Sequence, residues 1–331
     1  MIVTLLAGLS LAGGWVMGDS RPGPLLFVVN QGDKTMSVVD AGTNKQVAVV
    51  DEHQTTMHGH EIAVGPDNRT VFMPIYGNVG VGAPGLDGHE MLAIDGRTGE
   101  ITGRVDFGHG VRPHCVVFEP TRKLLYVTTE LDDTITIVDP KTLKVVGTVP
   151  TGAPQSHMLA VTRDGKLGYT SNVNPGSVSV LDLVARKTLA VIPISAVSQR
   201  IALSRDDRWV FTSDQTQTRM AAIDTKTNKI AHWIELPGHG YGSAATPNGK
   251  WLLVPVPGKN LVAVVDISQM KVDRTIPVDP APQEMLVRPD GKFAYVASAS
   301  AKKLSVIDLK LWKQVASVDV GNYPDGLAWA N

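Results

Sequence analysis

The stretch LLYVTTELDDTITIVD at residues 124–139 decides the fold of this chain, because similar stretches recur at a nearly constant spacing. Each copy ends a short apolar run at an aspartate, as in TIVD, SVLD, AVVD and SVID. A first copy ends at Asp40, 55 residues before the second, and the later intervals are 44, 43, 42, 42 and 42 residues. Seven copies of one unit therefore fill nearly the whole chain, and the other six end at Asp95, Asp139, Asp182, Asp224, Asp266 and Asp308.

A period near 42 residues with several short β-rich runs predicts a propeller, because one such unit cannot bury both of its faces alone. The third copy contains four strands, in GVRPHCVVFEP, TRKLLYVTT, DTITIVD and LKVVGTVP. The first copy, in residues 25–50, has only three strands, and YPDGLAWAN at residues 323–331 supplies the fourth. We therefore expect an all-β, seven-bladed propeller of four-stranded antiparallel blades, closed by pairing of the C-terminal strand with the N-terminal three.

The units LLYVTTELDDTITIVDPKT and FAYVASASAKKLSVIDLK, each approached through a PTR or PDG turn, resemble the YVTN family of seven-bladed β-propellers. The resemblance covers residues 25–331. That family includes surface-layer proteins, periplasmic proteins, and relatives of lactonases and haem d1 proteins. The resemblance thus implies a fold more specifically than a function. Its default implication is a non-catalytic binding propeller, and a lactonase-like hydrolase is a further alternative.

The composition fits one large β domain without a linker, which we place at residues 19–331. The formal net charge is −1 and there is no basic cluster, so neither nucleic acid nor an anionic membrane surface is an expected partner. The single cysteine, Cys115, excludes an internal disulfide, and its place in an innermost strand predicts a packing role.

The first 18 residues are apolar and are followed by a polar, proline-containing segment, which predicts a signal peptide although a basic start is missing. The alternative is an apolar segment that packs on the propeller. No other segment is apolar enough to span a bilayer. We therefore expect a periplasmic or secreted protein with no integral membrane span.

Alignment of the seven copies shows one position, at the start of each innermost strand, that is always polar or aromatic. Innermost strands surround the channel of a propeller, so these residues are expected to form a ring around one mouth. Eight of the nine histidines are predicted to lie on this face, the exception being His232. The ring residues are His60, His114, His157, Gln199, Tyr241, Gln283 and Asp325.

Three imidazoles from successive blades predict a metal site, because histidine is a common ligand of Zn, Cu and Fe and three ligands leave places open for water or substrate. The predicted ligands are His60, His114 and His157. Glu130 and His89 are the candidates for proton transfer. The remaining ring positions are expected to bind the ligand or cofactor, and they are Gln199, Tyr241, Gln283 and Asp325.

Two further carboxylates adjoin the ring, Glu61 and Glu284, and they are candidates to complete the metal shell, orient an imidazole or act as a general base. The alternative is that strand alternation points them away from the channel. A structural reading of the histidines also stays open, since a ring imidazole can donate to a carbonyl of the next blade. The insertion between Tyr76 and Glu90 is either a lid or binding loop over the mouth, with Asp87 and His89, or a tolerated surface loop.

The leading functional prediction is an exported propeller with a histidine-rich divalent metal site at the channel mouth. It would act on a small molecule by metal-assisted hydrolysis, elimination or oxidation. The alternative is a propeller that binds a metal, a cofactor or a protein partner on the same face without catalysis.

Overall fold

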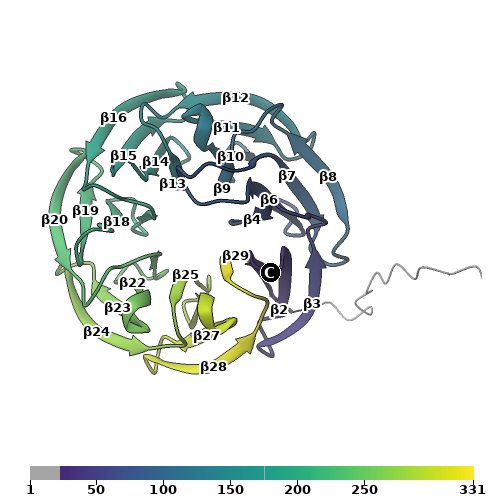
Figure 1. The fold of residues 1–331 in the computed structure, drawn as a ribbon. Helices are drawn as coiled ribbons and strands as arrows, with labels where there is room; N and C mark the ends of the chain where they lie inside the picture. Colours follow the sequence, from purple (N-terminus) through teal and green to yellow (C-terminus); the bar gives the residue numbers. More distant parts are fainter. Residues whose placement is uncertain (1–22, 175) are drawn as a thin grey trace, which may run out of the picture.

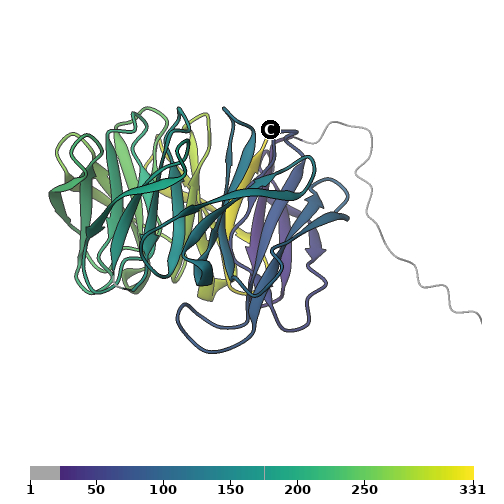
Figure 2. The same ribbon diagram turned by 90° about the horizontal axis from the view of Figure 1, so that it is seen from above.

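A computed structural model of the chain describes residues 23–174 and 176–331, so the predicted signal peptide at residues 1–18 lies outside the described residues. Seven antiparallel sheets are arranged radially around a central channel (Figure 1). Figure 2 shows the same ring from the side, with one long loop that projects beyond one face. The predicted seven-bladed propeller is confirmed.

From the channel outward, blade 1 consists of β29 (Pro324–Ala330), β1 (Leu25–Asn30), β2 (Thr35–Asp40) and β3 (Lys45–Asp51). Blade 2 has an inner strand in two pieces, and it consists of β4 (His58–Gly59), β5 (Ala63–Val64), β6 (Thr70–Gly77), β7 (Asp87–Asp95) and β8 (Ile101–Asp106). Blade 3 consists of β9 (Pro113–Glu119), β10 (Leu124–Thr129), β11 (Thr134–Asp139) and β12 (Lys144–Pro150). Blade 4 consists of β13 (Ser156–Val161), β14 (Leu167–Asn172), β15 (Ser177–Asp182) and β16 (Lys187–Pro193).

Blade 5 consists of β17 (Ala202–Leu203), β18 (Trp209–Ser213), β19 (Arg219–Asp224) and β20 (Lys229–Glu235). Blade 6 consists of β21 (Ala244–Ala245), β22 (Trp251–Val256), β23 (Leu261–Asp266) and β24 (Lys271–Pro277). Blade 7 consists of β25 (Pro282–Val287), β26 (Phe293–Ser298), β27 (Lys303–Asp308) and β28 (Lys313–Asp319). Short 3-10 turns follow the second strands of blades 3, 6 and 7, and they are η1 (Glu130–Asp132), η2 (Pro257–Lys259) and η3 (Ala299–Ala301).

The recurrent aspartates have a structural role. In every copy Oδ1 of the aspartate accepts a hydrogen bond from the backbone N–H two residues later, over 2.7–3.0 Å. Such a bond fixes the turn between the third and fourth strands, because a short polar side chain takes the place of a backbone acceptor. The strongest sequence signal is therefore a turn signal.

The hydrophobic core lies between neighbouring blades, where the faces of successive sheets pack together. One cluster joins blades 1 and 2 through Phe27 and Met73, and another joins blades 3 and 4 through Tyr126 and Leu159. Cys115 belongs to the second cluster and is 4% exposed, and its burial raises the pKa of the thiol to about 12. This agrees with a packing role, since only the thiolate is a strong nucleophile.

The ring closes as predicted, because β29 pairs with β1 in an antiparallel register in which Leu25 lies opposite Ala330 and Leu26 lies opposite Trp329. Closure joins the two ends of the described chain and leaves no blade with a missing inner strand. Among residues 23–174 and 176–331 no helix is long and apolar enough to cross a membrane.

Candidate functional site

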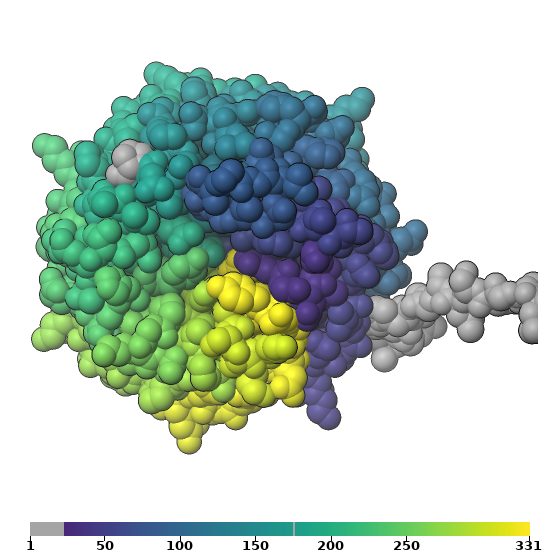
Figure 3. Space-filling view, in the orientation of Figure 1, coloured from purple at the N-terminus to yellow at the C-terminus, as the bar shows by residue number. Residues whose placement is uncertain are grey.

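A cavity of about 140 Å³ lies at one mouth of the channel. Six of the seven predicted ring residues line it, and they are His60, His157, Gln199, Tyr241, Gln283 and Asp325. The seventh, His114, is fully buried behind the cavity wall, against His157. In Figure 3 the first strand region, the insertion and the last strand meet at the centre of this face. A space of this volume accepts a small molecule or a part of one.

A β-bulge explains how two successive residues of an inner strand reach the channel. In β9, for instance, Pro113 pairs with Thr129 and Val116 pairs with Val127, so one extra residue lies in the inner strand. The same shift occurs in β13, β25 and β29 at the ring position. A bulge re-aims the side chains next to it. Simple strand alternation, which directs Glu61 and Glu284 away from the channel, is therefore wrong here.

The residue after the ring position in blade 5, Arg200, reaches across the channel to carboxylates of three other blades. Its guanidinium is 3% exposed and pairs with Glu61, with Glu284 at 3.1 Å and with Asp325 at 3.1 Å. Burial raises the pKa of Glu61 well above its usual range and that of Glu284 as well. Burial also opposes ionisation of Asp325, but the adjacent Arg200 holds its pKa below the usual value.

The predicted metal ligands do lie together. The ring centroids of His114 and His157 are 3.6 Å apart with an angle of 31° between their planes, and His60 lies 5.0 Å from His114. Tyr76 stands edge-on to the cluster, 5.3 Å from His114. His58 extends it on the other side, 4.8 Å from His60. Four imidazoles and one phenol thus form a continuous chain of ring contacts at the channel mouth.

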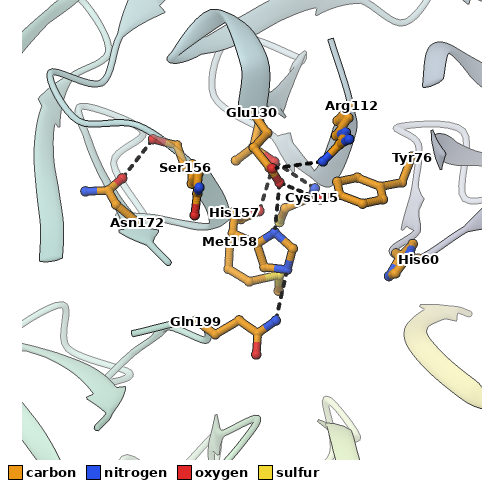
Figure 4. Close-up of polar contacts among 12 residues, drawn as sticks. His60, Tyr76, Arg112, Cys115, Glu130, Ser156, His157, Met158, Asn172 and Gln199 are labelled. Carbon is orange, nitrogen blue, oxygen red and sulfur yellow. Dashed lines mark hydrogen bonds and ion pairs between the residues drawn. The ribbon is translucent and has the colours of Figure 1, made fainter. Parts of the chain in front are cut away.

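Glu130, the predicted proton-transfer residue, is buried beside this cluster (Figure 4). The hydroxyl of Tyr76 donates to its Oε2 over 2.7 Å, and Nδ1 of His157 lies 3.6 Å from the same oxygen. A guanidinium nitrogen of Arg112 lies 3.9 Å from Oε1. Burial and the adjacent Glu130 raise the pKa of the Tyr76 phenol above its usual range, so Tyr76 is a hydrogen-bond donor at neutral pH.

Several imidazole nitrogens in the cluster are buried without a hydrogen-bond partner among the described residues. They are Nδ1 of His58, Nε2 of His60, both nitrogens of His114 and Nδ1 of His157. Buried polar atoms in native proteins are nearly always satisfied, so a group of this kind indicates a ligand, a water or an ion. No other part of the described chain gathers as many unpartnered ring nitrogens.

Three of these imidazoles, those of His58, His114 and His157, are neutral at neutral pH. Burial lowers the pKa of His157 to about 4, and burial together with the neighbouring His157 and His60 lowers that of His114 well below its usual range. Burial and His60 also lower the pKa of His58 to about 4. Neutral imidazole is the form that binds metal ions, because one nitrogen keeps its lone pair.

The same rings do not converge on one point. In the part of the chain that the structure describes, no three His, Cys, Asp or Glu side chains are placed to hold a metal ion. His114 and His157 are stacked, whereas ligands at about 2.1 Å must direct their lone pairs at a common centre. Metal binding would therefore require one of these two rings to turn.

Other predicted residues lie elsewhere or play different parts. His89 is on β7, with its side chain 49% exposed and 3.3 Å from Asp106, so the structure does not bring it to the cavity. Asp87 accepts a hydrogen bond from Arg112 over 2.6 Å, and Arg112 also donates to the carbonyl of Ala83 over 2.7 Å. The insertion is thereby fixed to the propeller by a buried arginine.

The insertion forms part of the cavity wall, through Gly80 and Val81. Gln31, Arg200 and Tyr323 also line the cavity. The sequence did not indicate Gln31 and Tyr323 as site residues, nor that Arg200 lies at the centre of an ion cluster. Nε2 of Gln31 lies 2.8 Å from Nδ1 of His60, and it also donates to Asp325. Gln31 follows the second strand of its blade, on the same face as the insertion. Only this position in the repeat could have indicated that Gln31 lies at the channel mouth.

Fold and cavity together define a seven-bladed β-propeller with a polar, small-molecule-sized site at one mouth of its channel. A family model described as "Lactonase, 7-bladed beta-propeller" matches residues 25–235, more than half of the chain, and the chain belongs to this family. The predicted resemblance to lactonase-like propellers is confirmed. A search of curated protein sequences gave no match.

Solved structures share the fold at low identity. "Kuenenia stuttgartiensis Hydrazine Synthase" is 19% identical with a TM-score of 0.70, over 83% of this chain and 90% of that chain. "Dihydro-heme d1 dehydrogenase NirN in complex with DHE" is 14% identical with a TM-score of 0.69, over 94% of this chain and 76% of that chain. At these identities the likeness concerns the fold alone.

Proposed function

We propose that the protein binds a small molecule in the channel cavity and hydrolyses it, with a divalent metal ion held by His60, His114 and His157. The observation that carries this proposal is the set of buried, unpartnered imidazole nitrogens beside the cavity. A metal ion satisfies such nitrogens, and burial keeps His114 and His157 neutral, which leaves lone pairs available. When bound, a divalent ion of Zn, Cu or Fe supplies a polarising charge and an activated water.

Two carboxylates have the places expected of residues that orient metal-binding imidazoles. Glu130 faces Nδ1 of His157 at 3.6 Å, and Asp325 faces Nδ1 of His60 at 3.5 Å. In metal sites a carboxylate commonly accepts the proton of the ring nitrogen that does not bind the metal. At His60 the Nε2 amide group of Gln31 lies 2.8 Å from Nδ1 and also donates to Asp325, so Asp325 acts on this ring through Gln31. Only Glu130 is placed to accept a ring proton directly.

Residues of the protein itself would transfer the proton and hold the metal ligands in position. Glu130 is the group placed to accept or return a proton at His157, and Tyr76 holds the Glu130 carboxylate by donating to Oε2. Asp325 and Gln31 fix His60. The insertion closes one side of the cavity with Gly80 and Val81 and limits the access of water.

Hydrolysis is preferred over elimination or oxidation because the family carries the name lactonase. A lactone or ester carbonyl in the cavity is the substrate class that this name and the volume of about 140 Å³ support. The particular lactone is set by residues outside the small cavity.

The test is proton release from simple γ- and δ-lactones in a pH-stat, with chelator-treated protein and with protein reconstituted separately with Zn²⁺, Cu²⁺ or Fe²⁺. Turnover that requires one metal and is lost in His114→Ala supports the proposal. His109→Ala is the matched control, because its imidazole is 62% exposed on the same face and pairs with Asp132 at 2.9 Å. Equal loss in both variants, or turnover without metal, would refute the metal-dependent mechanism.

A non-catalytic binding role is the second candidate. It is favoured by the ion cluster around Arg200, in which the charged groups of the cavity already satisfy one another across four blades. A retained ligand in the purified protein, combined with no turnover of any lactone under any metal, would favour this role.

We also propose that the protein is exported, on the basis of the apolar segment at residues 1–18. Mass spectrometry of the intact protein recovered from the periplasm or the medium tests this proposal. The expected result is a mature chain that begins near residue 19. Full-length protein confined to the cytoplasm would contradict it.

A further inference from the structure

A larger pocket of about 610 Å³ opens beside the channel cavity, over blades 5 and 6. The two spaces share Tyr241 and Gln283, so these two side chains form the boundary between them. Its walls come from the Gln215 region after β18, from the segment that precedes β21, and from η2. The proposed reaction in the small cavity makes no use of this second space.

The walls of the pocket contain no carboxylate. They carry Lys259 and His239, both exposed, and Lys259 makes no ion pair within the described residues. Asp325 is the one acid among the described residues that line the neighbouring cavity, and it is already paired with Arg200. An anionic group in this pocket therefore meets one free ammonium group and no opposing negative charge.

The remaining walls are largely apolar or backbone, with two prolines at Pro237 and Pro257 and three glycines. Gly258 stands at an open part of the wall, because a Cβ placed there meets no atom within 4 Å. A pocket of 300–1,000 Å³ with such walls is of the size that holds a small organic molecule. Because the two spaces share Tyr241 and Gln283, one elongated molecule can extend from the channel cavity into this pocket.

We infer that this pocket binds the anionic end of an elongated organic molecule whose reacting carbonyl lies in the channel cavity. The inference deepens the proposed hydrolysis and rests on it for the reacting end. The substrate class is a lactone or ester that carries an apolar chain ending in a carboxylate or a similar anion. Tyr241 and Gln283 contact the middle of the chain, and Lys259 contacts its end.

Three matched lactones test the inference: one without a chain, one with a six-carbon chain ending in a carboxylate, and one with the same chain ending in a methyl amide. The carboxylate compound is expected to have a kcat/KM about two- to fivefold higher than the amide, as for one exposed ion pair. Lys259→Met should bring that ratio to about one. Lys187→Met, a change of an exposed lysine on β16, is the control and should retain the ratio.

Gly258→Phe tests the space itself, since the added ring fills the open wall without a clash at Cβ. With Gly258→Phe, the kcat/KM of both chain-bearing lactones should fall to that of the lactone without a chain. The inference is overturned if the wild type turns over the carboxylate lactone and the amide lactone equally well. It is also overturned if the preference for the carboxylate lactone survives in both Lys259→Met and Gly258→Phe.

Failure of the proposed hydrolysis is recognised separately, because then none of the three lactones is turned over. In that event the corresponding lactams, which resist hydrolysis, are titrated calorimetrically. Tighter binding of the carboxylate chain than of the amide chain, lost in Lys259→Met, supports the pocket. Equal binding of the two overturns it.

Discussion

The guanidinium of Arg200 donates a hydrogen bond to Asp325 over 3.1 Å, so a side chain of blade 5 binds the strand that closes the ring. The same group pairs with Glu61 of blade 2 and Glu284 of blade 7. Four blades are thus joined across the channel by one arginine. These ion pairs lie at the channel cavity, and all of them involve Arg200.

Arg200→Met is expected to destabilise the protein by about 3 kcal/mol at pH 8, because it leaves buried carboxylates without a cation. Urea unfolding at that pH measures the change. Arg163→Met serves as the control, since the Arg163 side chain is 56% exposed in its pair with Asp207 and its loss should cost less than about 1 kcal/mol. Equal effects of the two changes would contradict the assigned role.

Tyr76→Phe should lower the free energy of unfolding by about 2 kcal/mol, the size typical of a hydrogen bond to a charged group. The reason is that Glu130 loses the hydroxyl that donates to it over 2.7 Å. Tyr169→Phe is a matched control, because Tyr169 is equally buried but its hydroxyl has no partner among the described residues. A larger loss for Tyr169→Phe than for Tyr76→Phe would disprove the Tyr76–Glu130 interaction.

Glu52 makes stability depend on pH. Its side chain is fully buried, and burial raises the pKa of the carboxyl from 4.5 to about 7, although it accepts a hydrogen bond from the Gly59 N–H. A raised carboxyl pKa means that the folded protein retains the proton longer than the unfolded chain. This contribution is fully present below about pH 4.5 and is lost as the pH rises to about 7.

The loss between the two pKa values amounts to roughly 3 kcal/mol. In Glu52→Gln the part of the decline that Glu52 causes should disappear, so the variant should lose less stability than the wild type between pH 5 and 8, while the acceptor for Gly59 is kept. Urea unfolding at pH 5, 6, 7 and 8 measures both proteins. Parallel curves for the wild type and the variant would show that Glu52 titrates normally.

Much of the fold follows from spacing in the sequence, since the aspartate repeat gives the blade number and the incomplete first copy gives the closing strand. The ring of residues at the channel mouth follows from the same alignment, which brings residues as distant as His60 and Asp325 together. The repeat shows which positions of the seven blades are equivalent. In a closed ring, equivalent positions lie at the same distance from the central axis and at the same height along it.

What the sequence does not reveal depends on local backbone geometry. One extra residue in each of the inner strands of blades 2, 5 and 7 directs Glu61, Arg200 and Glu284 toward one another. No residue pattern in the sequence marks these positions. The positions of Gln31 and His89 depend on how loops fold over the mouth. His89 remains at the surface because it lies on β7 and pairs with Asp106.

The central claim is that the channel-mouth imidazoles hold a metal ion, and elemental analysis of untagged protein purified without chelator tests it most directly. The comparison is the triple variant His60→Ala, His114→Ala, His157→Ala, with its folding checked by circular dichroism. The account predicts about one equivalent of Zn, Cu or Fe in the wild type and none in the folded variant. No metal in the wild type, even after reconstitution, or the same metal content in both proteins, would contradict it.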